Sequence, residues 1–151
     1  MFSAQQSAHQ NELEDQRAKN ERQIEELRAQ DAALQAYLDQ MSQLMLGGNL
    51  RYSEEDSEVR TLARARTRTV LARLDGQRKG RVVQFLYEAS LIVREHPVVS
   101  LSDVRLRGAD LSHLDLSGAD LSSANLSSAD LSDADYTLSL HDALPIWKSV
   151  V

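Results

Sequence analysis

The chain has 151 residues, of which 42% are hydrophobic and only 5% aromatic, and its formal net charge is −6. So few aromatic side chains favour an elongated or repetitive architecture over one large core, and the negative charge argues against non-specific binding of nucleic acid. The absence of cysteine excludes disulfides, thiolate metal sites and cysteine nucleophiles. No apolar run reaches the roughly 18 residues that would span a bilayer, and the first residues lack the basic and apolar regions of a secretory signal. We therefore expect the chain as written to be soluble and cytoplasmic.

Residues 7–46 are predicted to form one long helical stalk. The segment contains no glycine or proline and is rich in Ala, Glu, Gln, Arg and Leu, all of which favour helix. Ser7 and Gln10 fit a capping box at its start, and Gly47 with Gly48 fits a stop at its end. At 1.5 Å per residue such a helix would be about 60 Å long.

The apolar residues of this stalk recur at helical spacing only in its C-terminal half, and the same frame is polar upstream. They are Ile24, Leu27, Leu34, Leu38, Met41 and Met45. Two interpretations remain open. Either the last turns of an amphipathic stalk pack on the rest of the protein, or several copies form a homo-oligomeric coiled coil through this helix.

Residues 50–96 are predicted to form an antiparallel helical hairpin. Ser53 is followed by three acidic residues, which fits a helix start because acids are stabilised at the positive end of the helix dipole. Apolar faces run over residues 56–74 and 78–93, with Asp75 and Gly76 closing the first helix. Two adjacent apolar faces joined by a short turn favour antiparallel packing.

Residues 60–81 of the hairpin carry eight basic residues, opposed within this stretch only by Asp75: Arg60, Arg64, Arg66, Arg68, Arg73, Arg78, Lys79 and Arg81. They are consistent with a solvated face that pairs with acidic residues of the first helix, with a surface facing an anionic membrane, or with a nucleic-acid patch. Nucleic acid is the least favoured partner, because the basic stretch lacks the aromatic, Asn and Gln side chains that usually read bases.

Residues 98–135 repeat with a period of five, with leucine at every fifth position from 101 to 131. This period fits neither a helix nor a strand, because the leucines would spiral around the helix or alternate between the faces of the strand. The chain must therefore turn a corner every five residues, so that each leucine points to a common axis. We expect Asp110, Asp120 and Ser122 to be exposed. The predicted inward-pointing residues are Leu101, Leu106, Ala109, Leu111, Leu114, Leu116, Ala119, Leu121, Ala124, Leu126, Ala129 and Leu131.

Units such as Ala109-Asp110-Leu111-Ser112-His113 resemble the A-(D/N)-L-x-x unit of pentapeptide repeat proteins. The resemblance implies an α+β fold, in which the long helix and the hairpin are followed by a short, truncated right-handed quadrilateral β-helix. This pentapeptide repeat solenoid would have four pentapeptides to a coil. The hairpin and its bridge also resemble a segment that precedes the repeats in some bacterial members of the family. Those members look membrane-anchored through upstream helices, which implies such an anchor in a full-length parent.

The period of five stops after Asp135. Residues 136–146, YTLSLHDALPI, resemble the translation of a common short-read sequencing adapter. We therefore predict that residues 136–151 are a non-native tail that does not continue the repeats, and that the chain is a fragment of a larger bacterial protein. His141 and Asp142 then carry no weight as an acid–base pair.

The sequence offers no constellation that points to a catalytic residue, a cofactor or a metal. His9, His96 and His113 share no ligand spacing, and the repeat serines have no paired base. A glycine-rich phosphate loop is absent too. We therefore expect no enzyme activity and no bound cofactor.

The leading hypothesis for function is a non-catalytic scaffold or protein-interaction module whose protein partner the sequence does not identify. One alternative is a membrane-associated signalling scaffold, through the basic hairpin and a lost upstream anchor. A second alternative, with less support, is a DNA mimic acting on a type II topoisomerase. The resemblance suggests that activity through the aspartates that precede the repeat leucines, but fewer than two coils make a short rod.

Overall fold

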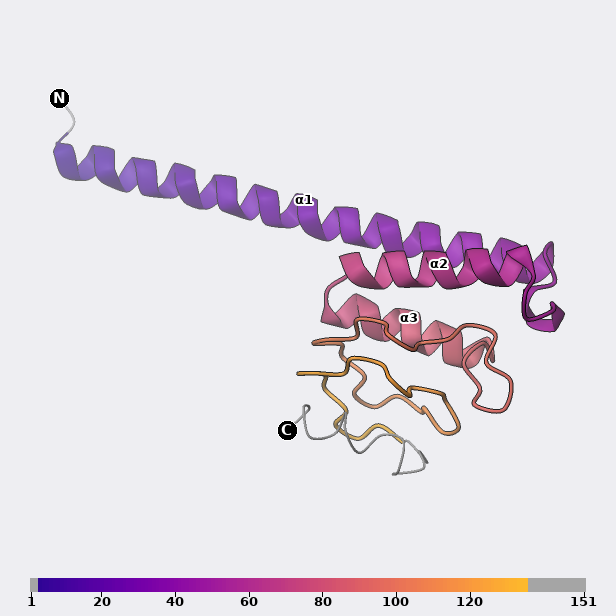
Figure 1. Ribbon diagram of the computed structural model, residues 1–151. Coiled ribbons are helices and arrows are strands. Elements are labelled where there is room, and N and C mark those ends of the chain that lie inside the picture. Colours follow the sequence, from indigo (N-terminus) through magenta and orange to yellow (C-terminus); the bar gives the residue numbers. More distant parts are fainter. Residues whose placement is uncertain (1–2, 136–151) are drawn as a thin grey trace.

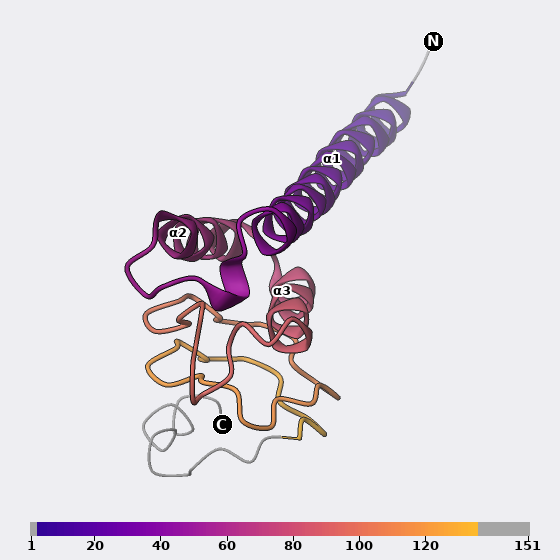
Figure 2. The ribbon, with the colours of Figure 1, turned by 90° about the vertical axis from the view of Figure 1, so that its right-hand side faces the viewer.

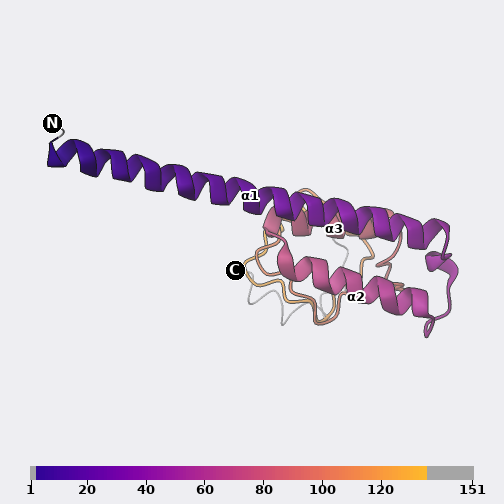
Figure 3. The ribbon, with the colours of Figure 1, turned by 90° about the horizontal axis from the view of Figure 1, so that it is seen from above.

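The computed structural model describes residues 3–135. In chain order it contains α1 (Ala4–Leu46), the 3₁₀ turn η1 (Leu50–Tyr52), α2 (Glu58–Arg73) and α3 (Gly76–Glu88). Residues 98–135 follow, and we call them the repeat stack. The C-terminal half of α1 lies against α2 and α3, which in turn lie on the start of the repeat stack (Figures 1 and 2). The N-terminal half of α1 projects beyond the other elements (Figure 3). Within the described part, no helix is long and apolar enough to cross a membrane.

The N-cap of α1 lies four residues before the predicted one. Ser3, rather than Ser7, is the N-cap, and its hydroxyl accepts a hydrogen bond from the backbone N–H of Gln6. The Gln6 side chain accepts in turn from the backbone N–H of Ser3, which completes the capping box. The end of α1 at Leu46, next to Gly47, is as predicted.

The C-terminal half of α1 contributes to the core, and the N-terminal half does not. Leu34, Tyr37 and Met41 are buried, whereas Ile24 and Leu27 are 48% and 38% exposed. This confirms the interpretation that the last turns of the stalk pack on the rest of the protein. Homo-oligomer formation through α1 stays a prediction.

Tyr37 ties α1 to both of the other helices. The Thr67 hydroxyl of α2 donates to the Ala63 carbonyl at 2.8 Å. Because that bond uses the only hydroxyl hydrogen of Thr67, the Tyr37 hydroxyl must donate to the Thr67 oxygen, across 2.7 Å. The Tyr37 ring also meets Phe85 of α3 edge-on, with ring centroids 6.3 Å apart.

The helices of the predicted hairpin run in opposite directions (Figure 1), but they pack mainly on α1 rather than on each other, and their boundaries differ from the predicted ones. Asp75 does not close α2; it caps α3, and its carboxylate accepts from the backbone N–H three residues later. Gly76 is the first residue of α3. The helix ends at Glu88 rather than near residue 93, because Ser90 takes up a left-handed conformation with φ of 58°.

Gly76 and Gly80 bring α3 into direct contact with the backbone of the repeat stack. A Cβ atom on Gly76 would lie 2.0 Å from the carbonyl oxygen of Gly108, and one on Gly80 would lie 1.9 Å from that of Asp110. The backbone N–H of Asp110 also donates to the carbonyl of Gly76 at 2.8 Å. The two glycines lie one turn apart on one helical face, so α3 covers the first layer of the stack without intervening side chains. One cluster of buried apolar side chains extends from Leu34 through the helices to Ala129.

The repeat stack turns a corner at every fifth residue from 103 to 133. Each corner residue has a left-handed backbone, with φ between 55° and 73°. Glycine relieves the strain at Gly108 and Gly118, and Asp, His or Ser occupies the other corners. Four corners return the chain to its starting side, so that residues 20 apart in sequence meet. The N–H of Leu106 donates to the carbonyl of Asn125 at 3.0 Å, and the N–H of Asn125 donates to the carbonyl of Val104 at the same distance. Residues 99–118 therefore form a first layer and 119–135 a second.

The predicted fold class, α+β with a right-handed quadrilateral β-helix over residues 98–135, is wrong. Residues 3–135 contain helices and turns but no β-strand and no sheet. The two layers meet through isolated parallel bridges: Arg105–Asn125, Asp110–Asp130 and Asp115–Asp135. A strand needs several successive ladder pairs, and here a left-handed corner in every five residues ends the pairing after a single bridge. The prediction of a non-native tail concerns residues 136–151, which lie outside the described part.

Candidate functional site

Five successive repeat units form the same side-chain hydrogen bonds on the outside of the stack. In each, the Oδ1 atom of an Asp or Asn accepts from the backbone N–H and from the hydroxyl of the serine two residues later. In one unit, the Asp115 oxygen lies 3.0 Å from the Ser117 nitrogen and 2.6 Å from the Ser117 hydroxyl. The pairs are Asp110–Ser112, Asp115–Ser117, Asp120–Ser122, Asn125–Ser127 and Asp130–Ser132. These local bonds hold the outer side chains in fixed rows.

The same bonds make Asp115 and Asp130 weak bases. The hydroxyl and the backbone N–H of Ser117 hold the pKa of Asp115 below its ordinary value, and Ser132 does the same for Asp130. A general base needs a pKa near the working pH, and these carboxylates have moved away from it. The Ser–Asp pairs therefore stabilise turns and are poorly suited to act as a nucleophile with its base.

A His–Asp pair on the surface of the stack also lacks the geometry of a catalytic site. His113 and Asp133 are corner residues in different layers, with the imidazole Nδ1 3.6 Å from a carboxylate oxygen, and both are largely exposed. The neighbouring Ser132 hydroxyl donates to Asp130 rather than to the imidazole, so nucleophile, base and orienting acid are not aligned. In residues 3–135, no group of three His, Asp or Glu side chains is placed to hold a metal ion.

The inward-pointing residues of the repeats lie mainly in the interior of the stack. Leu114 and Leu131 are only half-buried. Asp110 is exposed, and Asp120 and Ser122 are half-buried. The buried members are Leu101, Leu106, Ala109, Leu111, Leu116, Ala119, Leu121, Ala124, Leu126 and Ala129. Because these apolar side chains fill the interior, a partner would meet the polar rows outside.

The eight basic residues of the hairpin are dispersed over several surfaces. Arg78 has only 11% of its side chain exposed, and it pairs with Asp31 of α1 at 2.8 Å and with Asp75 at 2.6 Å. The Arg64 side chain donates to the carbonyl of Val98 at the start of the stack, at 3.3 Å. These two arginines therefore act inside the protein, joining α3 to α1 and α2 to the stack.

The other basic side chains point to different places. Arg60 donates to the hydroxyl of Ser53 at 3.1 Å, and Lys79 donates to the carbonyl of Arg107 at 3.0 Å. Two more are exposed on their helices, Arg68 and Arg81. The structure thus does not gather the predicted basic patch into one surface.

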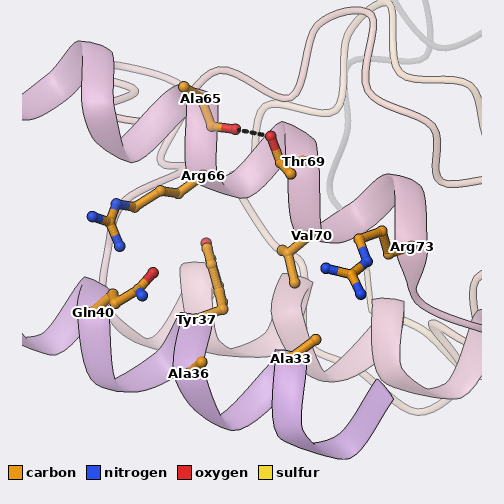
Figure 4. Close-up of a pocket in the computed structure, with 9 residues that line it drawn as sticks. All are labelled: Ala33, Ala36, Tyr37, Gln40, Ala65, Arg66, Thr69, Val70 and Arg73. Carbon is orange, nitrogen blue, oxygen red and sulfur yellow. Dashed lines mark hydrogen bonds between the residues drawn. The ribbon is translucent and has the colours of Figure 1, made fainter. Parts of the chain in front are cut away.

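Arg66 and Arg73 lie at opposite ends of an open groove of about 320 Å³ between α1 and α2. Figure 4 shows Tyr37 and Val70 between the two guanidinium groups. The Nε atom of Arg66 is buried and has no hydrogen-bond partner among the described residues. The groove is mainly apolar, and its arginines do not meet the remaining basic side chains.

A second hollow brings together residues that no local sequence pattern connects. Lys79 of α3 lines it with Arg105 and Arg107 of the first layer and with Asn125 and Ser128 of the second. The sequence signal for this grouping is the 20-residue offset between layers, which pairs Arg105 with Asn125. Without that offset, residues 79, 105 and 125 share no local pattern.

The fold and its outer rows define a repeat protein, with a projecting helix, a helical cover and a two-layer stack of five-residue units. Residues 100–135 match the family model of pentapeptide repeats, in eight copies. This segment therefore consists of pentapeptide repeats, as its sequence resemblance predicts. No curated protein and no solved structure matched the chain.

Proposed function

We propose that the chain is a non-catalytic interaction module, in which the repeat stack presents its outer rows to a protein partner. The observation that carries this proposal is the repeated Asx–Ser bonding, which fixes the polar side chains and occupies the serine hydroxyls. Side chains that are already ordered lose little conformational entropy on binding. Support also comes from the lowered pKa of Asp115 and Asp130, which disfavours base catalysis by these groups.

The charge of the stack points to a partner with basic side chains. Three of its four sides carry aspartates, and these acids lie in columns that continue from one layer to the next, as at Asp110 and Asp130 or at Asp115 and Asp135. Opposite charges on the two sides of an interface speed the encounter of the partners and disfavour partners of the wrong sign. We infer that a Lys- or Arg-rich protein segment binds along the acidic column of Asp110 and Asp130.

Binding of the full chain to an array of peptides of varied charge tests this proposal. We expect the retained peptides to be basic, and we expect the double variant Asp110→Lys, Asp130→Lys to lose them. The matched control is Asn125→Lys, which adds a positive charge on the side of the stack that has no acid and should leave peptide binding unchanged. Peptide binding without a basic bias, or binding that survives the double variant, would contradict the proposal.

The proposal that the basic hairpin lies on an anionic membrane has less support. Arg64 and Arg78 are used in internal contacts, and the remaining basic side chains are spread over several surfaces. A membrane-facing segment usually gathers its basic residues on one side. We therefore place the interaction surface on the repeat stack rather than on the hairpin.

A further inference from the structure

The hollow beside Lys79 lies where α2, α3 and both layers of the repeat stack meet. Its volume is about 610 Å³. The lining residues are Ala72, Lys79, Arg105, Arg107, Gly108, Asn125 and Ser128. Three of the seven are cationic and none is acidic, which sets this hollow apart from the rest of the stack.

One side of the repeat stack differs from the others in charge. This side, which consists of residues 104–108 and 124–128, carries two arginines and no acid. The other three sides carry between them all the aspartates from Asp103 to Asp135. Lys79 adds a third cation at the edge of the basic side, from α3. The acid whose charge acts on Lys79 is Asp75, which is itself paired with Arg78 at 2.6 Å. The positive charge of Lys79, Arg105 and Arg107 is thus not neutralised by an acid that lines the hollow.

Asn125 supplies a donor at a position where the neighbouring units have acids. In residues 109–135, the residue before each repeat leucine is Asp in every complete unit except this one. The Oδ1 atom of Asn125 accepts from the N–H and the hydroxyl of Ser127, at 3.1 and 2.7 Å. The turn uses that oxygen as an acceptor. The NH₂ group of the Asn125 amide is therefore left as a donor. An aspartate here would instead present a second carboxylate oxygen.

The Lys79 ammonium is held at the rim of the hollow by the chain itself. It donates to the carbonyl of Arg107 at 3.0 Å, and an ammonium has three hydrogens, so further donors remain. Burial lowers the pKa of Lys79, and the Asp75 charge opposes that change. A bound anion would favour the charged form of this group.

We propose that this hollow binds the phosphate group of a small anionic ligand. The side chains around it offer ammonium, guanidinium, amide and hydroxyl donors. Phosphate oxygens accept several charge-assisted hydrogen bonds at once, and arginine is suited to bind them in pairs. Free phosphate compounds and the headgroups of anionic lipids share this chemistry. The site is separate from the acidic columns. The proposal of a phosphate site therefore does not depend on whether those columns bind a protein.

Calorimetric titration of the full chain with inorganic pyrophosphate tests the site, and phosphatidylcholine vesicles with and without phosphatidic acid test the lipid source. We expect pyrophosphate or the phosphatidic acid vesicles to bind. The variant Asn125→Asp should weaken that binding about tenfold or more, since it replaces a donor by a charged acceptor. Arg105→Gln should have a similar effect. Because Asn125→Asp restores the residue found in the neighbouring units, it should leave thermal unfolding unchanged.

Asp115→Asn is the matched control, because it makes the reverse exchange on the opposite side of the stack, two corners away from residues 104–108. It should leave affinity for pyrophosphate unchanged within a factor of about two, as a distant surface charge is largely screened at physiological salt. Binding only to phosphatidic acid vesicles would identify the source as lipid and would still support the site. No binding to either probe, or binding that Asn125→Asp and Arg105→Gln leave intact, would overturn the proposal.

Discussion

At the scale of the residue, each of the five repeat units in residues 109–133 has an Asp or Asn that accepts two hydrogen bonds from the serine two residues later. In one such unit, the hydroxyl of Ser132 and then its backbone N–H hold the pKa of Asp130 below its ordinary value of 3.8. Since the folded pKa is lowered, the stabilisation is present above that ordinary value and is lost as the pH falls through the folded pKa. The repeat stack should therefore weaken in acid.

The first prediction is that Ser132→Ala raises the pKa of Asp130 toward 3.8, because the largest cause of its lowering is removed. Carboxyl chemical shifts in a pH titration by NMR measure this directly. The matched control is Ser117→Ala, which should raise the pKa of Asp115 and leave that of Asp130 unchanged. An Asp130 pKa that is the same with and without the hydroxyl would show that the bond has no influence on it.

The second prediction concerns the buried hydroxyl of Tyr37. Removing it in Tyr37→Phe leaves the Thr67 oxygen without its donor, which should cost about 1 kcal/mol of unfolding free energy. Burial also raises the pKa of Tyr37 above its ordinary value of 10.0. The stability that the Tyr37 hydroxyl contributes is thus complete below about pH 10 and falls as the pH rises further. Tyr37→Phe should lack this pH dependence.

Chemical denaturation at neutral and alkaline pH measures both effects in Tyr37→Phe. The control is Tyr52→Phe, because Tyr52 is 78% exposed and its hydroxyl has no buried partner to lose. Equal stability of the Tyr37 variant and the parent chain would mean that the hydroxyl contributes nothing net.

At the scale of the element, the contact between α3 and the repeat stack depends on the absence of side chains. Alanine inside a helix is usually more stable than glycine, by about 0.5–1 kcal/mol. At Gly80 the sign should reverse, because the new Cβ would lie 1.9 Å from the carbonyl oxygen of Asp110. We predict that Gly80→Ala destabilises the chain by about 1–3 kcal/mol, since the helix must move off the stack.

Thermal unfolding of Gly80→Ala beside Gly47→Ala tests this contact. A Cβ on Gly47 would lie 3.3 Å from the carbonyl oxygen of Gln43, and its φ of −91° suits any residue, so that variant should be close to neutral. A stabilised Gly80 variant would show that α3 does not rest on the backbone of residues 108–110.

The sequence predicts local features of these elements better than the contacts between them. The end of α1 beside Gly47 follows from a local signal, and so do the five-residue corners. The start of α1 is missed because Ser3 with Gln6 and Ser7 with Gln10 fit the same capping pattern. Gly76 is mistaken for a stop, because its role is set by a contact with Gly108, far along the chain. Regular strands are wrongly predicted for residues 98–135. The period of five gives the position of each corner, but it does not give the number of residues that form backbone pairs between two corners.

At the scale of the whole molecule, the candidate phosphate site shows why sequence patterns alone were insufficient. Its cations come from residues 79, 105 and 107, and its neutral donors from 125 and 128. Only the stacking of one layer on the next, with α3 lying across the first, places them around one hollow. The eight basic residues of the hairpin illustrate the opposite case. They are close in sequence, but helical rotation and internal contacts send them to different surfaces.

The last prediction concerns the projecting half of α1. In the structure the best heptad positions, around Leu34 and Met41, are buried against α2 and α3 and so are not free to pair with another copy. The exposed half keeps few apolar residues, among them Leu13 and Ile24, and an isolated helix of this kind is only marginally stable in water. Amide hydrogen exchange should therefore be fast over residues 5–28 and slow over residues 34–45, at every protein concentration. The Ser3–Gln6 cap slows fraying but cannot supply the missing tertiary contacts. Protection of residues 5–28 that rises with concentration, and that Ile24→Glu abolishes, would instead mean that copies of the chain associate through this helix.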